Sequence, residues 1–134
     1  MTSTKTTDGM TALTPPGTLV ESAPSLKLHA DDAASLLSAM SNAKRLLILC
    51  NLVGGEMPVG QLAETVGLSQ SALSQHLAKL RSRNLVRTRR DAQTIYYSIA
   101  SADVFEVLDT LGGIYVKPNA ATRAQPTEKH ARAS

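Results

Sequence analysis

SQSALSQHLAKLR, at residues 69–81, is predicted to form a short helix with one apolar face. Ser69 is suited to cap the N-terminus of this helix. Leucines at positions 73, 77 and 80 recur at helical spacing, which predicts that their face is buried. The opposite face begins with small polar residues and becomes basic toward the C-terminus. Such a helix is typical of proteins that bind the major groove of DNA, where polar groups contact bases and cations contact phosphates.

LVRTRRDAQTIYYSI, at residues 85–99, follows after three residues and predicts a β-hairpin. Its strands are expected at Leu85–Arg90 and Gln93–Ile99, with a turn at Asp91 and Ala92. Apolar residues alternate along the second strand, which indicates that one of its faces is buried. Because the first strand contains three arginines, the hairpin is expected to add positive charge beside the helix.

The positive charge of the chain is concentrated in this region. Residues 69–100 contain six Lys and Arg residues and one Asp, a net charge of +5, whereas the whole chain of 134 residues has a net charge of +3. A surface that faces phosphates requires such a local excess. The alternative is a basic face that is merely solvated.

The composition predicts one small domain. The chain is 43% hydrophobic but has no Trp, one Phe and three Tyr, which favours a helical fold with an aliphatic core. Cys50 is the single cysteine, so an intramolecular disulfide is excluded, and a reducing, cytoplasmic location is expected. The sequence shows neither a signal-peptide pattern nor an apolar run long enough to span a membrane.

The folded domain is expected at residues 26–116, between a disordered arm at residues 1–25 and a disordered tail at residues 117–134. The arm is rich in Thr and contains three prolines, the tail is rich in Ala and contains two prolines, and both lack a sustained apolar period. Four further helices are predicted besides the one at residues 69–81. The first follows Asp31 and Asp32, and the second runs from Asn42 to Gly54. The third has Pro58 in its first turn, and the last follows Ser101. The pattern after Asn42 is apolar nearly all round and predicts a central, buried helix.

Three segments together resemble the ArsR family of bacterial transcription regulators. They are LSAMSNAKRLLIL at residues 37–49, LAETVGLSQSALSQHLAKLR at residues 62–81 and the hairpin at residues 85–99. The hairpin is similar to the branch that includes the rhizobial nodulation repressor and redox- and persulfide-responsive repressors. The resemblance covers about residues 30–116. It implies a mainly α-helical winged helix-turn-helix with a small β-hairpin wing.

The resemblance further implies a homodimer, joined through its first and last helices, that represses transcription by binding a palindromic operator. The apolar stripe along the last helix also favours a dimer, because so small a domain does not readily cover it. The expected interface residues are Leu36, Leu37, Met40, Val104, Val107, Leu108, Leu111 and Tyr115.

The candidate DNA contacts come from the polar face of the helix and from the hairpin. The expected base contacts are Gln70, Ser71, Ser74 and Gln75. The expected contacts to the DNA backbone are His76, Lys79, Arg81, Arg87, Arg89, Arg90 and Gln93. For His76, which is predicted at the edge of the core, a packing role is an equal alternative.

No metal or other cofactor is expected. The helix that carries the metal-binding cysteines of the family contains no Cys here, and the last helix contains no His. The redox branch uses two cysteines; Cys50 matches the first, but Val116 occupies the position of the second, so an intrachain disulfide cannot form. Cys50 is either a small apolar residue packed beside Leu46, Leu49 and Val53, or a reactive thiol.

Two other classes of protein compete with a DNA-binding regulator. An enzyme is not expected, because no catalytic triad, phosphate-binding glycine loop or metal set can be assembled from three scattered histidines and one cysteine. A winged-helix module that binds protein partners without specific DNA binding is the alternative. The six basic residues between Lys79 and Arg90 argue against that alternative.

Overall fold

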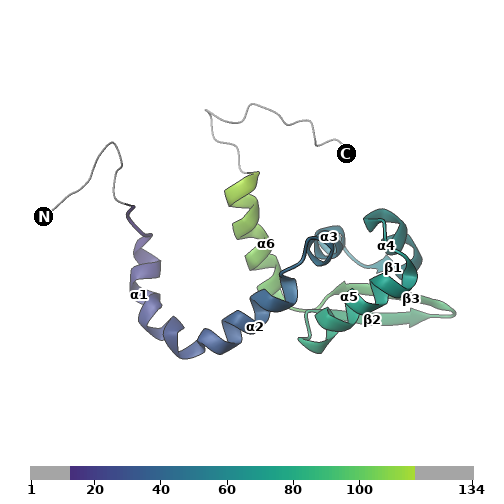
Figure 1. The fold of residues 1–134 in the computed structure, drawn as a ribbon, viewed down its shortest axis with the longest axis horizontal. Coiled ribbons are helices and arrows are strands. Elements are labelled where there is room, and N and C mark those ends of the chain that lie inside the picture. The colour runs from purple at the N-terminus through teal and green to yellow at the C-terminus, as the bar shows by residue number, and fades with distance from the viewer. Residues whose placement is uncertain (1–12, 117–134) are drawn as a thin grey trace, which may run out of the picture. The chain divides into compact units, whose positions relative to one another are not determined.

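A computed structural model describes residues 13–116 as helices together with a small antiparallel sheet (Figure 1). The chain divides into two compact units, with the boundary after Ser38. The elements in chain order are α1 (Gly17–Leu26), the 3-10 helix η2 (Lys27–His29), α2 (Ala30–Met40), α3 (Ala43–Leu52), β1 (Met57–Pro58), α4 (Val59–Val66), α5 (Gln70–Ser82), β2 (Val86–Asp91), β3 (Thr94–Ile99) and α6 (Ala102–Tyr115).

The first unit contains a helix that the sequence pattern did not indicate. The predicted disordered arm extends to residue 25, yet Gly17–Leu26 is helical. Pro16 precedes the first helical residue and its carbonyl accepts bonds from the amides of Leu19 and Val20, so it starts the helix rather than breaking it. The helix buries no residue. Residues 1–12 of the predicted arm and the predicted tail at residues 117–134 lie outside the described part of the chain.

Helix α3 begins at a side-chain cap, at the residue where the sequence predicts its start. The Asn42 side-chain oxygen accepts a hydrogen bond of 3.1 Å from the amide of Arg45. Ile48, Leu49 and Leu52 are buried, but Leu47 and Val53 are 45% and 49% exposed. The prediction of a helix buried all round therefore holds for one side of α3 only.

The connection between α4 and α5 is a tight turn. Gly67 ends α4 in the left-handed conformation, with φ of 73°, and the amide of Leu68 donates to the carbonyl of Ala63 at 3.0 Å. Ser69 then caps α5, because its hydroxyl accepts a bond of 3.1 Å from the amide of Ala72. The predicted cap at Ser69 is confirmed.

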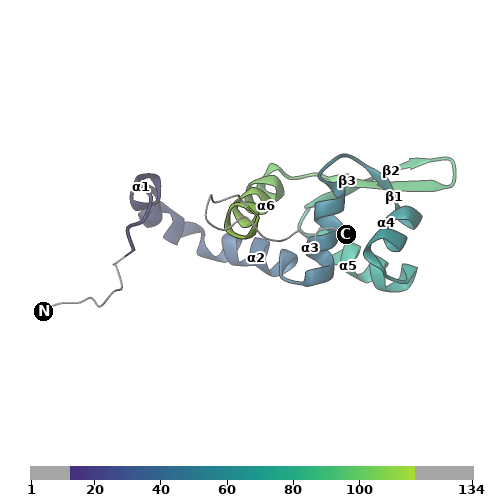
Figure 2. The same ribbon diagram turned by 90° about the horizontal axis from the view of Figure 1, so that it is seen from above.

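Strand β3 lies between β1 and β2 in the sheet (Figure 1). Figure 2 shows the hairpin of β2 and β3 from a second side. The predicted hairpin is confirmed, with strand ends shifted by one residue, and Asp91 pairs with Thr94 so that the turn falls on Ala92 and Gln93. Strand β1 was not predicted. Its Pro58 pairs with Tyr96 and precedes α4 as the N-cap, not as a residue of the first turn.

The core of the second unit joins every helix from α3 to α6. The side chains with less than 2% exposure are Ile48, Leu49, Leu52, Leu62, Leu73, Leu77, Leu80 and Val104.

Two residues predicted for a dimer interface belong to this core instead. Met40 and Val104 are 2% and 0% exposed within a single chain, so neither has a surface left for a partner. Within residues 13–116, every helix is too short or too polar to span a bilayer.

Candidate nucleic-acid interface

The polar face of α5 is exposed along its whole length. The three leucines of the opposite face are at most 1% exposed, and α5 contacts α3, α4 and β2. All four predicted base-contact residues, Gln70, Ser71, Ser74 and Gln75, are exposed. They lie in the first two turns of the helix, and Lys79 and Arg81 follow in its last turn. The helix therefore offers uncharged hydrogen-bonding groups at one end and cations at the other.

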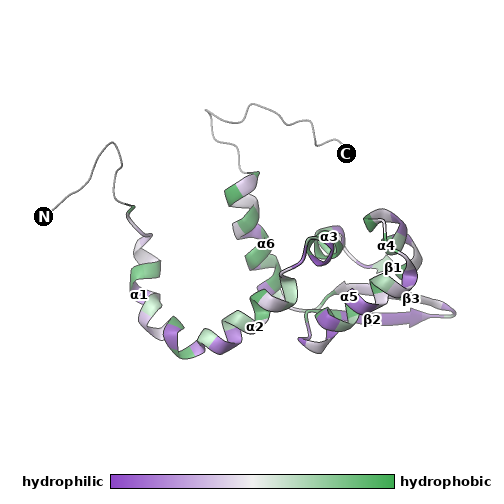
Figure 3. Ribbon diagram, in the orientation of Figure 1, coloured by the Kyte–Doolittle hydropathy of each residue, from purple (hydrophilic) through white to green (hydrophobic). Residues whose placement is uncertain are grey.

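The β2–β3 hairpin is the wing of this fold, and its outer strand is strongly polar (Figure 3). Arg87, Arg89 and Arg90 on β2 and Gln93 in the turn are exposed. Ala92 adopts a φ of 58°, in the left-handed region, which lets two residues close the hairpin. All the exposed arginines of β2 thus lie within a few residues of the wing tip.

Arg89 differs from the other two arginines of β2 because its charge is already balanced. Its Nε and Nη2 donate to the two carboxylate oxygens of Glu56 at 3.0 and 2.7 Å, and its guanidinium lies 4.4 Å from the centre of the Tyr96 ring. The hydrogen bond from Arg89 lowers the pKa of the Glu56 carboxyl below its ordinary value. Nothing in the sequence pattern indicated Glu56, which lies 33 residues from Arg89 in the chain.

His76 is half-buried, and its Nδ1 lies 3.4 Å from Nη1 of Arg45 on α3. This contact favours the packing role that the sequence left open beside a contact to a DNA phosphate.

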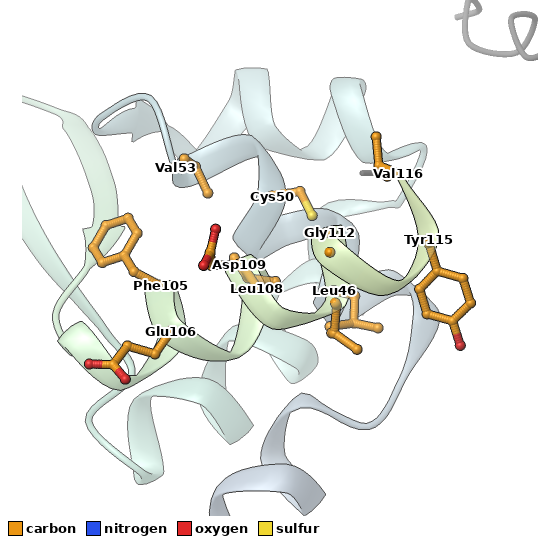
Figure 4. A pocket seen from close by; sticks show the side chains of 12 residues that line it. Leu46, Cys50, Val53, Phe105, Glu106, Leu108, Asp109, Gly112, Tyr115 and Val116 are labelled. Atoms are coloured by element: carbon orange, nitrogen blue, oxygen red, sulfur yellow. The ribbon is translucent and has the colours of Figure 1, made fainter. Parts of the chain in front are cut away.

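A second surface feature is an apolar groove between α3 and α6, with a volume of about 1260 Å³ (Figure 4). Leu46, Cys50 and Val53 line it from α3, and Phe105 and Leu108 are among the residues that line it from α6. On α6 and just after it, Phe105, Ile114, Tyr115 and Val116 are 44–80% exposed. Several large apolar side chains are thus exposed on α6 and just after it, and Figure 3 colours much of this helix as hydrophobic.

Cys50 is exposed in this groove, which corrects the interpretation that packs it inside the subunit. The helix pattern could not distinguish a core face from an open apolar face. Partial burial nevertheless raises the pKa of the Cys50 thiol above its ordinary value, which lowers the fraction of reactive thiolate. Among residues 13–116, no group of three or more His, Cys, Asp and Glu side chains is placed to hold a metal ion.

The fold, the capped α5 helix and the basic wing define a winged helix-turn-helix DNA-binding protein. The profile of the family described as "Bacterial regulatory protein, arsR family" matches residues 42–88. The chain is 61% identical over 97 residues to nodulation protein NolR of Rhizobium meliloti, covering 72% of this chain and 80% of the relative. It is 48% identical over 87 residues to the transcriptional activator HlyU of Vibrio cholerae, covering 65% of this chain and 81% of the relative.

A solved structure agrees with this relationship. The transcriptional repressor BigR of Xylella fastidiosa superposes with a TM-score of 0.68 at 33% identity, covering 72% of this chain and 98% of that chain. The chain belongs to the ArsR family of bacterial regulatory proteins, and it is a DNA-binding transcriptional regulator.

Proposed function

We propose that this protein is a transcriptional repressor that binds a palindromic operator as a homodimer, with no enzymatic activity of its own. The observation that supports this most directly is the arrangement of α5, whose exposed face changes from uncharged polar groups to cations along its length. Among the relatives, BigR is named a repressor and HlyU an activator; we propose repression, as for BigR. Because such a regulator binds the bacterial chromosome, we also propose a cytoplasmic location.

The residue roles follow from their positions. Gln70, Ser71, Ser74 and Gln75 contact base edges, because they are exposed at the N-terminal end of α5. Lys79, Arg81, Arg87, Arg90 and Gln93 contact the DNA backbone. Arg89 and His76 are expected to contribute less to backbone contact, because each already has a partner within the protein.

Selection from a pool of random duplexes tests this function. The full chain is expected to enrich one palindromic sequence whose half-sites are centred about one helical turn of DNA apart, as a two-fold dimer requires. Enrichment of no sequence would instead favour a winged-helix module that binds protein partners.

Arg90 is expected to act through its charge rather than through base recognition. Arg90→Ala should weaken binding to operator and random duplexes alike, and lower the slope of log affinity against log salt by about 0.9 for each phosphate that the variant no longer neutralises. The double variant Glu56→Ala/Arg89→Ala is the matched control on the same hairpin. It should change the slope less, because it removes an ion pair that carries no net charge. Equal changes in the two variants would contradict this distinction between them.

The dimer is proposed to form through exposed apolar side chains of α6 and of α2. Leu36, Leu37, Val107, Leu108, Leu111 and Tyr115 remain as interface candidates, and the exposed Phe105, Ile114 and Val116 join them. A second copy of the chain would remove the apolar area of these side chains from water.

Ile114→Glu is expected to raise the dissociation constant of the dimer at least about tenfold, because a carboxylate would be desolvated in the interface. Sedimentation measures this constant. Ala102→Glu adds the same charge at the exposed N-terminal end of α6, where the helix dipole favours it, and should leave the dimer intact. An Ile114→Glu protein as dimeric as the wild type would place the interface elsewhere.

A further inference from the structure

Two adjacent cations, Lys44 and Arg45, lie in the first turn of α3. The positive end of the helix dipole disfavours cations at this position. Neither residue belongs to the basic segment at residues 69–100, and the sequence pattern assigned them no role. Their hydrogen bonds show what the two side chains do.

Lys44 holds the end of α4. Its Nζ donates a hydrogen bond of 2.8 Å to the carbonyl oxygen of Val66, in a partly buried environment. Val66 is the last residue of α4, and the carbonyls of a last turn have no partner within their own helix. A cation there also interacts favourably with the negative end of the helix dipole. Lys44 therefore fixes the chain just before the Gly67 turn that leads into α5.

Arg45 holds the end of α2 and reaches α5. Only 8% of Arg45 is exposed. Its Nε donates to the carbonyl oxygen of Ala39 at 2.6 Å, a short, charge-assisted bond to the last turn of α2. On its other side, Nη1 lies 3.4 Å from Nδ1 of His76. A guanidinium has no acceptor, so in this contact Arg45 Nη1 can only donate and His76 Nδ1 can only accept.

We propose that Lys44 and Arg45 are positioning residues that set the orientation of α5 for DNA recognition. One turn of α3 fixes the end of α4 through Val66 and the middle of α5 through His76, on either side of the turn that joins these helices. The Lys44 ammonium and the buried Arg45 guanidinium are engaged with groups of the protein, so they add no phosphate contacts. This inference rests on the proposed operator binding.

The first test separates positioning from direct DNA contact. Lys44→Met and Arg45→Lys are expected to lose about tenfold in discrimination between the selected operator and a random duplex, as for one misplaced base contact. Their salt slopes should stay at the wild-type value. Lys79→Met, on the exposed face of α5, is the control and should weaken both duplexes equally while lowering the slope. Lys44→Arg keeps a donor at this position and should restore discrimination.

Unchanged discrimination in Lys44→Met and Arg45→Lys would overturn the proposal, and so would a salt slope lowered as in Lys79→Met. A second measurement does not depend on DNA. In the DNA-free full chain, amide hydrogen exchange at residues 67–75 should be faster in Lys44→Met than in Lys79→Met. Equal exchange in the two variants would also overturn the proposal. A wild-type protein that fails to discriminate between duplexes would refute the proposed function, and hydrogen exchange would still decide whether Lys44 positions α5.

Discussion

Leu77→Ala is expected to lower the free energy of unfolding by about 2–5 kcal/mol, the range found when a buried leucine is truncated. Leu77 is 1% exposed, in a helix that contacts α3, α4 and β2. Alanine would leave a cavity, and α3, α4 and β2 would all have to shift to close it. The leucine face of α5, the proposed DNA-recognition helix, therefore holds this helix on the domain.

Chemical denaturation followed by circular dichroism measures this change in stability. Wild type and variant must be compared at one protein concentration, because the proposed dimer would make stability depend on concentration. Lys79→Ala is the control two residues away on the exposed face, and it should change stability by no more than about 0.5 kcal/mol. If Leu77→Ala lowers the free energy of unfolding by less than about 1 kcal/mol, α5 is not packed as described.

Gln75→Ala is expected to reduce discrimination between operator and random DNA by about 1–3 kcal/mol, the value of one bidentate contact between an amide and a base. Gln75 is exposed in the second turn of α5, on the face opposite the leucines. Its amide offers both a donor and an acceptor, the pair that adenine matches in the major groove. The variant should fold normally, because the Gln75 side chain lies outside the core.

Competition binding with operator and random duplexes measures this change. Gln61→Ala makes the same substitution at an exposed site on α4, the first helix of the motif, and should leave discrimination unchanged. If Gln75→Ala weakens binding to both duplexes by the same factor, Gln75 does not contact a base.

The recognition helix and the wing were predictable because their signals are local. Ser69 caps α5, three leucines at helical spacing mark its buried face, and the strand alternation before Ile99 marks the hairpin. Each pattern lies within a dozen residues. The structure changes their limits by about one residue.

The predictions that failed depend on packing between distant segments. An apolar stripe does not show whether it faces the same chain or a second copy, so Val104 was assigned to an interface although it lies in the core. The same ambiguity applies to Cys50, for which packing inside the subunit was one of two interpretations and which is exposed.

Contacts between polar residues far apart in the chain gave no signal at all. The two-residue strand β1 is too short to show a periodicity, and the Glu56–Arg89 ion pair joins residues 33 apart. The bond from Lys44 to the carbonyl of Val66 spans 22 residues, and nothing in either local sequence indicates it.

We propose that the exposed face of α5 recognises a DNA sequence. The most direct test measures the affinity of the full chain for the selected operator and for a scrambled duplex of the same length and composition, at one near-physiological salt concentration. We predict that the operator binds at least about 10³-fold more tightly, the lower end for specific DNA-binding proteins. Equal affinity for the two duplexes would contradict the claim.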